Sequence, residues 1–269
     1  QRDLDRVLTC SYYRQLSDKT QVYTYFHSDL FRRRLTHVLE VHRLAITLCN
    51  YLYVNRDLVS CIAHAHDLGH VPFGHAGEEA IREWANGDDV SPHARDELLH
   101  FSHATHGLRV VDSLIDEYYL SKGYFGLNLT SEVREGILKH ACSNDQRVPD
   151  VDRRQVLHPN RPPTVEAQTV QMADLVASLV ADIEDALAAD LLTLNDVWRV
   201  EGLVEYVKKH SKSSREHGGI SRGDRANPHV LKSRLTWSLM KDAIDTTLTV
   251  LRKALPEEFA TFHEGEWDW

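Results

Sequence analysis

Residues 61–80, CIAHAHDLGHVPFGHAGEEA, gather side chains that can bind metals and transfer protons. Six such groups fall within fifteen positions: His64, His66, Asp67, His70, His75 and Glu78. Imidazole and carboxylate are common ligands of divalent transition metals, and histidine also titrates near neutral pH. Gly69 and Pro72 interrupt the helical pattern inside the same stretch. The first hypothesis is therefore a metal or acid–base site built around a turn.

His66 and Asp67 are neighbours at the point where a helix is expected to end. Adjacent helical side chains point about 100° apart, because the helix has 3.6 residues per turn. Both side chains can then reach one ion only if it lies near the helix terminus, which the break at Gly69 provides. The remaining ligands must come from other elements.

Two further candidate ligands lie on other predicted helices. His37 lies near the start of one, within RRRLTHVLEV, and Asp174 interrupts the apolar stripe of another, within VQMADLVASLV. A buried carboxylate without a partner costs several kcal/mol, so Asp174 needs a metal or an arginine beside it. A single buried histidine is more often a hydrogen-bonded core residue. The combined order H…HD…D favours the metal.

Helical periodicity dominates the elements that must position these residues. Apolar residues recur at three- and four-residue steps in six segments: 35–53, 57–68, 106–120, 130–141, 165–192 and 229–254. A further helix is expected to start over 78–84, and Asp57 and Thr130 are expected N-caps. The segments 143–163 and 211–228 read as loops, and the only short strand candidate is 21–25. The pattern predicts an all-α fold.

Composition bounds the class of protein. The 269 residues are 42% hydrophobic and 26% charged, which is typical of a soluble globular chain. A net charge of −9 does not indicate nucleic-acid binding, and no apolar run approaches a membrane span of about 18 residues. Four scattered cysteines without CxxC spacing, and a start without signal-peptide character, fit a reduced cytoplasmic protein.

The order His37, His66–Asp67, Asp174 resembles the HD phosphohydrolase superfamily. Closer still, four segments resemble the deoxyguanosine triphosphate triphosphohydrolase (dNTPase) family over about residues 10–195: RRRLTHVLEV, AHAHDLGHVPFGHAGEEA, FGLNLTSEVREGILKH and VEAQTVQMADLVASLVADIEDAL. Several other HD enzymes carry a glutamate three residues after the HD pair, where this chain has His70. The resemblance implies an HD-domain multi-helix bundle. We expect a core over 1–200 and a C-terminal helical extension over 201–269 packed on it, as a single domain overall.

The resemblance also implies roles for individual residues. The divalent metal would be held by His37, His66, Asp67 and Asp174. The catalytic cleft beside it would be lined by His70, His75, Glu78 and His103. For His75 and Glu78 the alternative is an i,i+3 surface pair at a helix start. The segment after His103 departs from the family pattern at Ala104, His106 and Gly107, which leaves His106 as a possible local substitute.

Residues that would bind the nucleotide are implied in the same way. Arg34 lies one helical turn before His37, where the family contacts phosphate, and a guanidinium suits bidentate phosphate binding. A solvated arginine in a basic cluster is the alternative. Lys139 and His140 are further phosphate candidates, Gln21 is associated with the sugar, and Asp182 with its 3′-hydroxyl. Ser178 stands where the family commonly has a tyrosine against the deoxyribose.

The function that the resemblance implies is hydrolysis of a deoxynucleoside triphosphate to deoxynucleoside and inorganic triphosphate. Mn²⁺ or Mg²⁺ is the expected cofactor, with Fe²⁺, Co²⁺, Ni²⁺ or Zn²⁺ as alternatives. The implied partners are the nucleotide and further copies of the chain in a dimer or hexamer, without a membrane or nucleic acid. An HD nucleotidase or phosphodiesterase acting on another phosphoester, and a catalytically weak nucleotide-sensing module, are the alternative functions.

Overall fold

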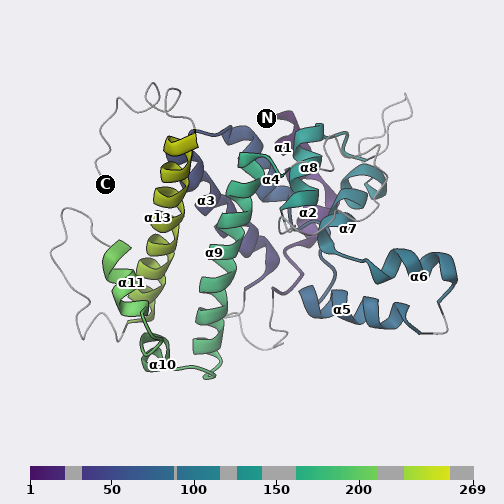
Figure 1. Cartoon of the computed structure of the whole chain (residues 1–269). Coiled ribbons are helices and arrows are strands. Elements are labelled where there is room, and N and C mark those ends of the chain that lie inside the picture. Colours follow the sequence, from purple (N-terminus) through teal and green to yellow (C-terminus); the bar gives the residue numbers. More distant parts are fainter. Residues whose placement is uncertain (22–31, 88–89, 116–125, 141–161, 211–226, 255–269) are drawn as a thin grey trace. The chain divides into compact units, whose positions relative to one another are not determined.

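The computed structural model describes residues 1–21, 32–87, 90–115, 126–140, 162–210 and 227–254. The chain divides into two compact units, Gln1–Gln171 and Met172–Trp269, whose elements are labelled in Figure 1. Regular structure in the described residues is helical, and the β-type pairing there is a single bridge between Thr20 and Arg33. The all-α prediction is confirmed. The expected division into 1–200 and 201–269 stays a prediction.

The first unit is a set of helices arranged around α4. Its elements are α1 (Arg2–Thr9), α2 (Ser11–Gln15), α3 (Arg34–Leu52), α4 (Arg56–Ala65), α5 (Gly74–Ala85), α6 (Pro92–Leu99), α7 (His103–Arg109), the π-helical turn η1 (Val110–Leu114) and α8 (Ser131–Lys139). Helix α4 packs against α1, α3 and α8, while α7 packs against α8 and α5 against α6. Figure 1 shows α5 and α6 running side by side away from the other helices of this unit.

Helix α4 is central because its last seven residues, Val59 to Ala65, are all buried, and all but His64 are apolar or small. A glycine in α8 allows the closest of its contacts. A Cβ atom on Gly136 would lie 2.4 Å from the Ile62 Cδ1 atom, so a larger residue there would push the two helices apart. This packing carries the end of α8, with Lys139 and His140, toward the end of α4, where His66 and Asp67 lie.

The second unit contains most of α9 (Val165–Ala188), with α10 (Leu194–Trp198), α11 (Leu203–His210) and α13 (Pro228–Ala254). Buried apolar residues join its helices through two small clusters, one around Val207 and Leu235 and the other around Trp198 and Leu231. Thr193 and Asp196 form a capping box at the start of α10.

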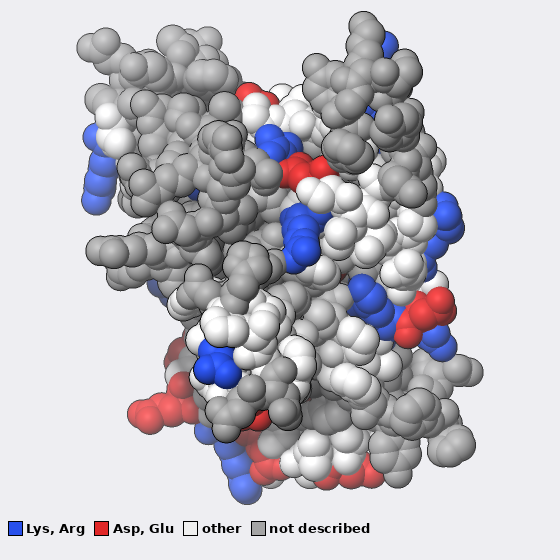
Figure 2. Space-filling model, turned by 90° about the vertical axis from the view of Figure 1, so that its right-hand side faces the viewer, with Lys and Arg blue, Asp and Glu red and all other residues white. Residues whose placement is uncertain are grey.

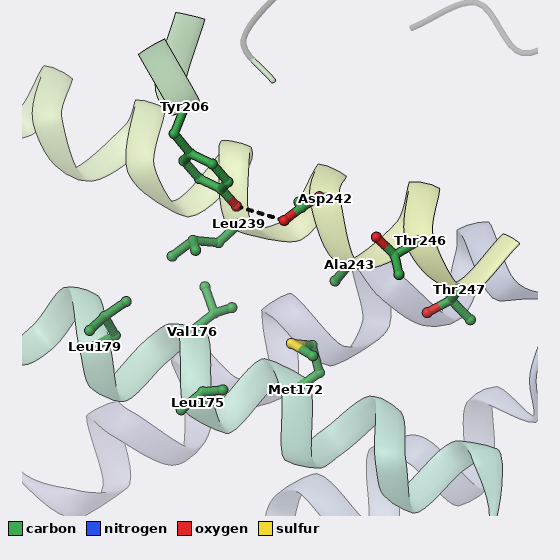
Figure 3. A pocket seen from close by; sticks show the side chains of 10 residues that line it. All are labelled: Met172, Leu175, Val176, Leu179, Tyr206, Leu239, Asp242, Ala243, Thr246 and Thr247. Atoms are coloured by element: carbon green, nitrogen blue, oxygen red, sulfur yellow. Dashed lines mark hydrogen bonds between the residues drawn. The ribbon is translucent and has the colours of Figure 1, made fainter. Parts of the chain in front are cut away.

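A pocket in this unit opens between α9 and α13 (Figure 3). Its α9 wall is apolar, and near the opposite wall the Tyr206 hydroxyl donates a hydrogen bond to Asp242 Oδ2 over 3.1 Å. The lining residues are Met172, Leu175, Val176, Leu179, Tyr206, Leu239, Asp242, Ala243, Thr246 and Thr247. None of the site residues predicted from the sequence is among them.

The predicted helices are confirmed with shifted ends at α3, α4, α8, α9 and α13. The prediction that Asp57 caps α4 is wrong, because the Asn55 side chain accepts the hydrogen bond from the Leu58 amide at 3.1 Å. Thr130 does occupy the N-cap position of α8, without a side-chain cap bond. Helix α5 begins at Gly74, four residues before Glu78, after Phe73 and Gly74 adopt positive φ angles of 68° and 56°.

The expected helix over 106–120 starts three residues earlier, at His103, and is followed by η1, which ends at Leu114. Residues 116–120 lie outside the described residues, as do most of the two expected loops, 143–163 and 211–228. The strand candidate 21–25 lies outside them beyond Gln21.

On the face drawn in Figure 2, the described residues form no extended patch of side chains with one sign of charge. Lys and Arg side chains stand apart there, several of them beside Asp or Glu and the rest among neutral residues. None of the described helices combines the length and apolar character that a membrane crossing needs. Cys10, Cys49 and Cys61 are buried free thiols.

The turn after α4 is held by a direct backbone contact with α7. A Cβ atom on Gly69 would lie 2.1 Å from the His103 carbonyl oxygen and 2.2 Å from the Gly107 nitrogen. These are backbone atoms, so no side-chain rotation could relieve the clash. Only glycine at position 69 allows the turn to lie this close to the start of α7, and this closeness brings His103 to the HD turn.

We expect Gly69→Ala to lower the free energy of unfolding by about 3 kcal/mol or more, because two backbone segments would have to separate. Urea unfolding of the variant and the wild type measures the loss. Gly87→Ala is the control: its Cβ atom would meet one carbonyl, that of Trp84, at 3.2 Å, so the cost should stay below about 1 kcal/mol. Equal losses in the two variants would contradict the close-contact explanation.

Candidate metal and acid–base site

The Asp67 carboxylate is the centre of a buried polar cluster at the end of α4. Arg34 Nη1 donates a hydrogen bond to Asp67 Oδ2 over 3.0 Å, and His37 Nε2 lies 4.0 Å from the same oxygen. The other oxygen, Oδ1, lies 3.5 Å from His66 Nε2 and 3.2 Å from His70 Nε2. Helix α3 supplies Arg34 and His37, and α4 with its turn supplies the others, as predicted.

The surroundings keep Asp67 ionised. Burial by itself would raise the pKa of this carboxyl, but the charges of His66, His70 and Arg34 and the hydrogen bond from His70 outweigh it. The pKa of Asp67 is therefore held well below its usual range. An ionised carboxylate with imidazoles on both sides is the protonation state that a metal ligand requires.

The hydrogen bonds of His66 fix its tautomer. Its Nδ1 atom lies 2.8 Å from the Ala63 carbonyl oxygen, which can only accept, so Nδ1 carries the proton. In the neutral ring the Nε2 atom beside Asp67 then carries the lone pair. This pattern, with one ring nitrogen bound to a backbone carbonyl, is usual for metal-binding histidines. The buried donor set of His37, His66 and Asp67 therefore fits a divalent metal.

A second cluster surrounds the Glu78 carboxylate on α5. His103 Nδ1 lies 2.8 Å from Glu78 Oε1, and His70 Nδ1 lies 3.3 Å from the same oxygen. The His70 and His103 rings are stacked, with centroids 3.8 Å apart. His75 is exposed at the edge of the cluster, and its ring meets those of His70 and His103 edge-on.

The structure thus brings together all four residues predicted for catalysis. Their ligand atoms lie within 4.8 Å of one another, so His70, His75, Glu78 and His103 could also hold an ion. Two of the rings are stacked face to face, however, and in-plane lone pairs of stacked rings do not converge on one ion. The observed geometry suits hydrogen bonding to Glu78 better than metal ligation.

His70 links the two clusters and can accept a proton between them. Burial lowers the pKa of His70 to about 4, with Asp67 opposing the shift and His103 and Arg34 adding to it. A neutral His70 donates from Nε2 to Asp67, so its Nδ1 lone pair faces the Glu78 oxygen. A proton arriving at either atom would turn this unfavourable contact into a hydrogen bond.

Glu78 is stabilised as a carboxylate. Burial would raise its pKa, but the hydrogen bond from His103 and the charges of His103, His70 and His75 lower it. Arg82, on the next turn of α5, adds a positive charge at 3.6 Å from Glu78 Oε2. The ionised Glu78 carboxylate therefore lies at the centre of this cluster, with the imidazole rings arranged around it.

His140, at the end of α8, extends the second cluster. Its Nδ1 atom donates to the Ile137 carbonyl over 2.7 Å, and its Nε2 atom lies 3.3 Å from His103 Nε2. With the proton on Nδ1, a neutral His140 can only accept at Nε2, so His103 must donate there. His103 also faces Glu78 Oε1 through Nδ1 at 2.8 Å, so its ring lies between Glu78 and His140.

The residues predicted to bind substrate have varied surroundings. Arg34 is buried against Asp67, which excludes the solvated-arginine alternative. Its Nη2 atom donates to the Gln21 carbonyl over 3.5 Å, so Gln21 lies beside it. Lys139 is also buried, and its ammonium group is paired with Glu135 one turn earlier on α8. Direct phosphate binding by Lys139 would compete with that pair, and this assignment stays a prediction.

The α9 residues lie in the second unit. Asp174 accepts a hydrogen bond from the Ser178 hydroxyl at its Oδ1 atom over 3.3 Å, and Asp182 is exposed one turn beyond Ser178. The Ser178 hydroxyl therefore helps to orient the Asp174 carboxylate. The roles of Asp174 as a metal ligand and of Asp182 in sugar binding stay predictions.

Two other histidines have structural roles. His106 Nδ1 donates to the Gly69 carbonyl over 2.8 Å, so His106 fastens the turn to α7, and its role as a substitute for His103 stays a prediction. His64 Nδ1 bonds to the Tyr13 hydroxyl at 2.9 Å, and its ring lies against His42. His64 belongs to neither cluster, as its spacing from His66 predicted.

Sequence reasoning missed two charged residues beside the clusters, Lys19 and Arg82. Lys19 Nζ donates to the His70 carbonyl over 2.7 Å, and Arg82 faces Glu78. A signal existed for each of them. Lys19 lies two residues before Gln21, which was a predicted substrate residue, and Arg82 lies four residues after Glu78 on one helix face.

The fold and the H…HD arrangement define an HD domain. The family model for the HD domain matches residues 34–179, more than half of the chain, and the chain belongs to this family. The match spans all four predicted metal ligands and the cluster around Glu78.

The chain is similar over nearly all its length to curated proteins named deoxyguanosinetriphosphate triphosphohydrolase-like protein. That of Ralstonia nicotianae (strain ATCC BAA-1114 / GMI1000) is 38% identical over 258 residues, covering 96% of this chain and 62% of the relative. Those of Thiobacillus denitrificans and Geobacter metallireducens are 38% and 36% identical, covering 93% and 92% of this chain and 61% and 59% of the relatives. The chain therefore spans about three-fifths of the length of these relatives.

The buried His64 makes stability depend on pH. Burial lowers the pKa of His64 to about 4 from an ordinary value of 6.5, and His42 and His66 act in the same direction. The unfolded chain therefore binds a proton at this residue before the folded chain does. The stability from a neutral His64 is fully present above pH 6.5 and is lost as the pH falls toward 4.

We expect wild-type protein to lose at most about 3 kcal/mol through His64 between pH 7 and pH 4. His64→Gln has no titrating ring and keeps a hydrogen-bonding group for Tyr13, so its stability should fall less over this range. Urea unfolding at several pH values, with chelator in every buffer, measures the difference. An unchanged pH dependence in the variant would show that His64 does not contribute.

Proposed function

We propose that this protein is a metal-dependent dNTP triphosphohydrolase, which hydrolyses a deoxynucleoside triphosphate to deoxynucleoside and inorganic triphosphate. The observation that carries the proposal is His70 lying between two carboxylates, 3.2 Å from Asp67 and 3.3 Å from Glu78. One carboxylate belongs to the donor set that fits a metal, and the other to a cluster of acid–base groups. The names and similarity of the relatives support the choice of nucleotide.

His37, His66 and Asp67 would hold the metal, with Asp174 as the fourth ligand. A bound Mn²⁺ or Mg²⁺ would lower the pKa of a coordinated water and polarise a phosphoryl oxygen. Arg34 keeps Asp67 ionised and in place through its hydrogen bond, and its charge favours an approaching phosphate. Asp182 and Gln21 are the groups proposed to face the sugar.

The Glu78 cluster would handle the proton. His75 is the most accessible of its histidines, so its ring can reach the oxygen that leaves with the nucleoside and donate a proton to it. Glu78 stabilises positive charge on the surrounding rings, and His103 holds Glu78 in place through the hydrogen bond at 2.8 Å. Assembly into a homo-oligomer and a cytoplasmic location belong to the same proposal.

We expect purified protein with Mn²⁺ or Mg²⁺ to release inorganic triphosphate and a deoxynucleoside from at least one dNTP, as resolved by ion-exchange chromatography. Asp67→Asn and Asp174→Asn should abolish this activity and weaken Mn²⁺ binding in calorimetry, because each removes an anionic ligand. Asp190→Asn, at an exposed position whose positive φ angle asparagine tolerates, is the control. Release of orthophosphate alone, or of no product from any dNTP, would refute the proposal.

His75→Ala should lower kcat by about 10²- to 10⁴-fold, because it removes the proposed proton donor. The melting temperature should change little, since the His75 side chain is exposed. His100→Ala, another exposed histidine, serves as the matched control in both assays. If both variants keep wild-type kcat, His75 is a surface residue of the α5 start and not the proton donor.

A further inference from the structure

Lys19 is held beside the start of α3 by backbone hydrogen bonds. The Arg34 amide donates to the Lys19 carbonyl over 2.9 Å, and the Gln21 amide donates to the Arg32 carbonyl over 3.1 Å. The bridge between Thr20 and Arg33 lies between these bonds. Lys19 is therefore fixed next to Arg34 although the two residues are fifteen positions apart in the sequence.

The Lys19 side chain lies at the HD turn. Its Nζ atom donates to the His70 carbonyl over 2.7 Å, and it is partly buried. Burial and the nearby Arg34 guanidinium lower the pKa of Lys19, while the Asp67 carboxylate acts in the opposite direction. The ammonium group therefore interacts electrostatically with both members of the Arg34–Asp67 pair.

The hydrogen-bond donors at this position exceed the acceptors. An ammonium group has three N–H donors, and among the described residues the His70 carbonyl is the one acceptor that Lys19 meets. Arg34 uses Nη1 for Asp67 and Nη2 for Gln21, while its buried Nε atom has no acceptor in the described part of the chain. Buried donors of this kind ordinarily have an acceptor, so a ligand with several oxygen atoms would complete the site.

The balance of charge agrees with an anionic ligand. Two cations, Lys19 and Arg34, lie beside one anion, Asp67, and the proposed metal would add further positive charge. Gly74 packs closely against this group, because a Cβ atom there would lie 2.7 Å from Arg34 Nη2 and 3.3 Å from the Gln21 carbonyl and would crowd the guanidinium. Lys139, the other predicted phosphate-binding lysine, has its charge matched by Glu135.

We propose that Lys19 and Arg34 form an oxyanion subsite and that Lys19 binds a phosphate group of the nucleotide directly. This inference rests on the proposed function for the identity of the substrate. A purely structural explanation competes with it, in which Lys19 only clamps the His70 carbonyl. The two explanations differ in what happens when the charge is removed and a hydrogen-bond donor is kept.

The experiment compares Lys19→Met, Lys19→Gln and Lys19→Arg in the full chain. Glutamine keeps an N–H for the His70 carbonyl without the charge, and arginine keeps the charge. Lys209→Met removes an exposed lysine of α11 and is the matched control. Calorimetry measures binding of inorganic triphosphate at one fixed free Mn²⁺ concentration, kinetics measure KM and kcat for dNTPs, and thermal unfolding reports stability.

We expect Lys19→Met and Lys19→Gln to weaken triphosphate binding by about 10- to 100-fold and to raise KM, because each loses a charge-assisted hydrogen bond. Lys19→Arg should recover part of this loss, and Lys209→Met should bind like the wild type. If Lys19→Gln binds triphosphate within about twofold of the wild type, or if the wild type binds none, the inference is overturned. A lowered melting temperature with unchanged binding would identify Lys19 as only a clamp.

The same measurements separate this inference from the proposed function. A wild-type protein that binds triphosphate through Lys19 but hydrolyses no dNTP would refute the function and leave the subsite standing. A protein that hydrolyses dNTPs with unaltered KM and triphosphate affinity in Lys19→Gln would refute the subsite alone.

Discussion

The structure of the site depends on one buried carboxylate, that of Asp67. Taking a negative charge out of water is costly unless cations or hydrogen-bond donors surround it. Arg34 and His37 reach it from α3, His66 from the end of α4 and His70 from the following turn. These elements converge on Asp67, and the lone pair of His66 Nε2 lies beside its carboxylate oxygen, so oxygen and nitrogen ligand atoms share one small volume. The groups that surround the buried Asp67 charge are thus largely the same groups that could bind a metal.

The second requirement is steric. The turn at Gly69 lies against the backbone of α7 so closely that no side chain fits, and His106 ties the Gly69 carbonyl to the same helix. This contact determines where His103 lies, and therefore which carboxylate it meets. Glu78 comes to the same place from α5, after a bend at Phe73 and Gly74 with positive φ angles. The close backbone contact at Gly69 thereby brings together acid–base residues from the turn after α4, from α5 and from α7.

At the centre of the site, some hydrogen-bond donors and acceptors have no complementary partner. The neutral His70 ring presents a lone pair to Glu78, and the His103 ring lies between Glu78 and His140. Such arrangements are costly in a merely structural core and useful where a proton must move. On the opposite side of Asp67, the donors of Lys19 and Arg34 exceed their acceptors. An anion arriving there and a proton arriving near Glu78 would each relieve an imbalance that folding leaves in place.

The sequence alone determined the helical class, the main helices and the chemistry of the site, because apolar periodicity and the spacing of His66, Asp67 and His70 are local properties of the chain. Helix ends were less predictable: Asn55 caps α4 where Asp57 was expected, since both are good caps and only backbone geometry selects between them. Tertiary structure decided what each charge does. Pairing between distant residues brought Lys19 to the HD turn, and the approach of α3 to the end of α4 gave Arg34 the partner Asp67. Charges act over distances in space, and the spacing of residues along a chain does not fix those distances.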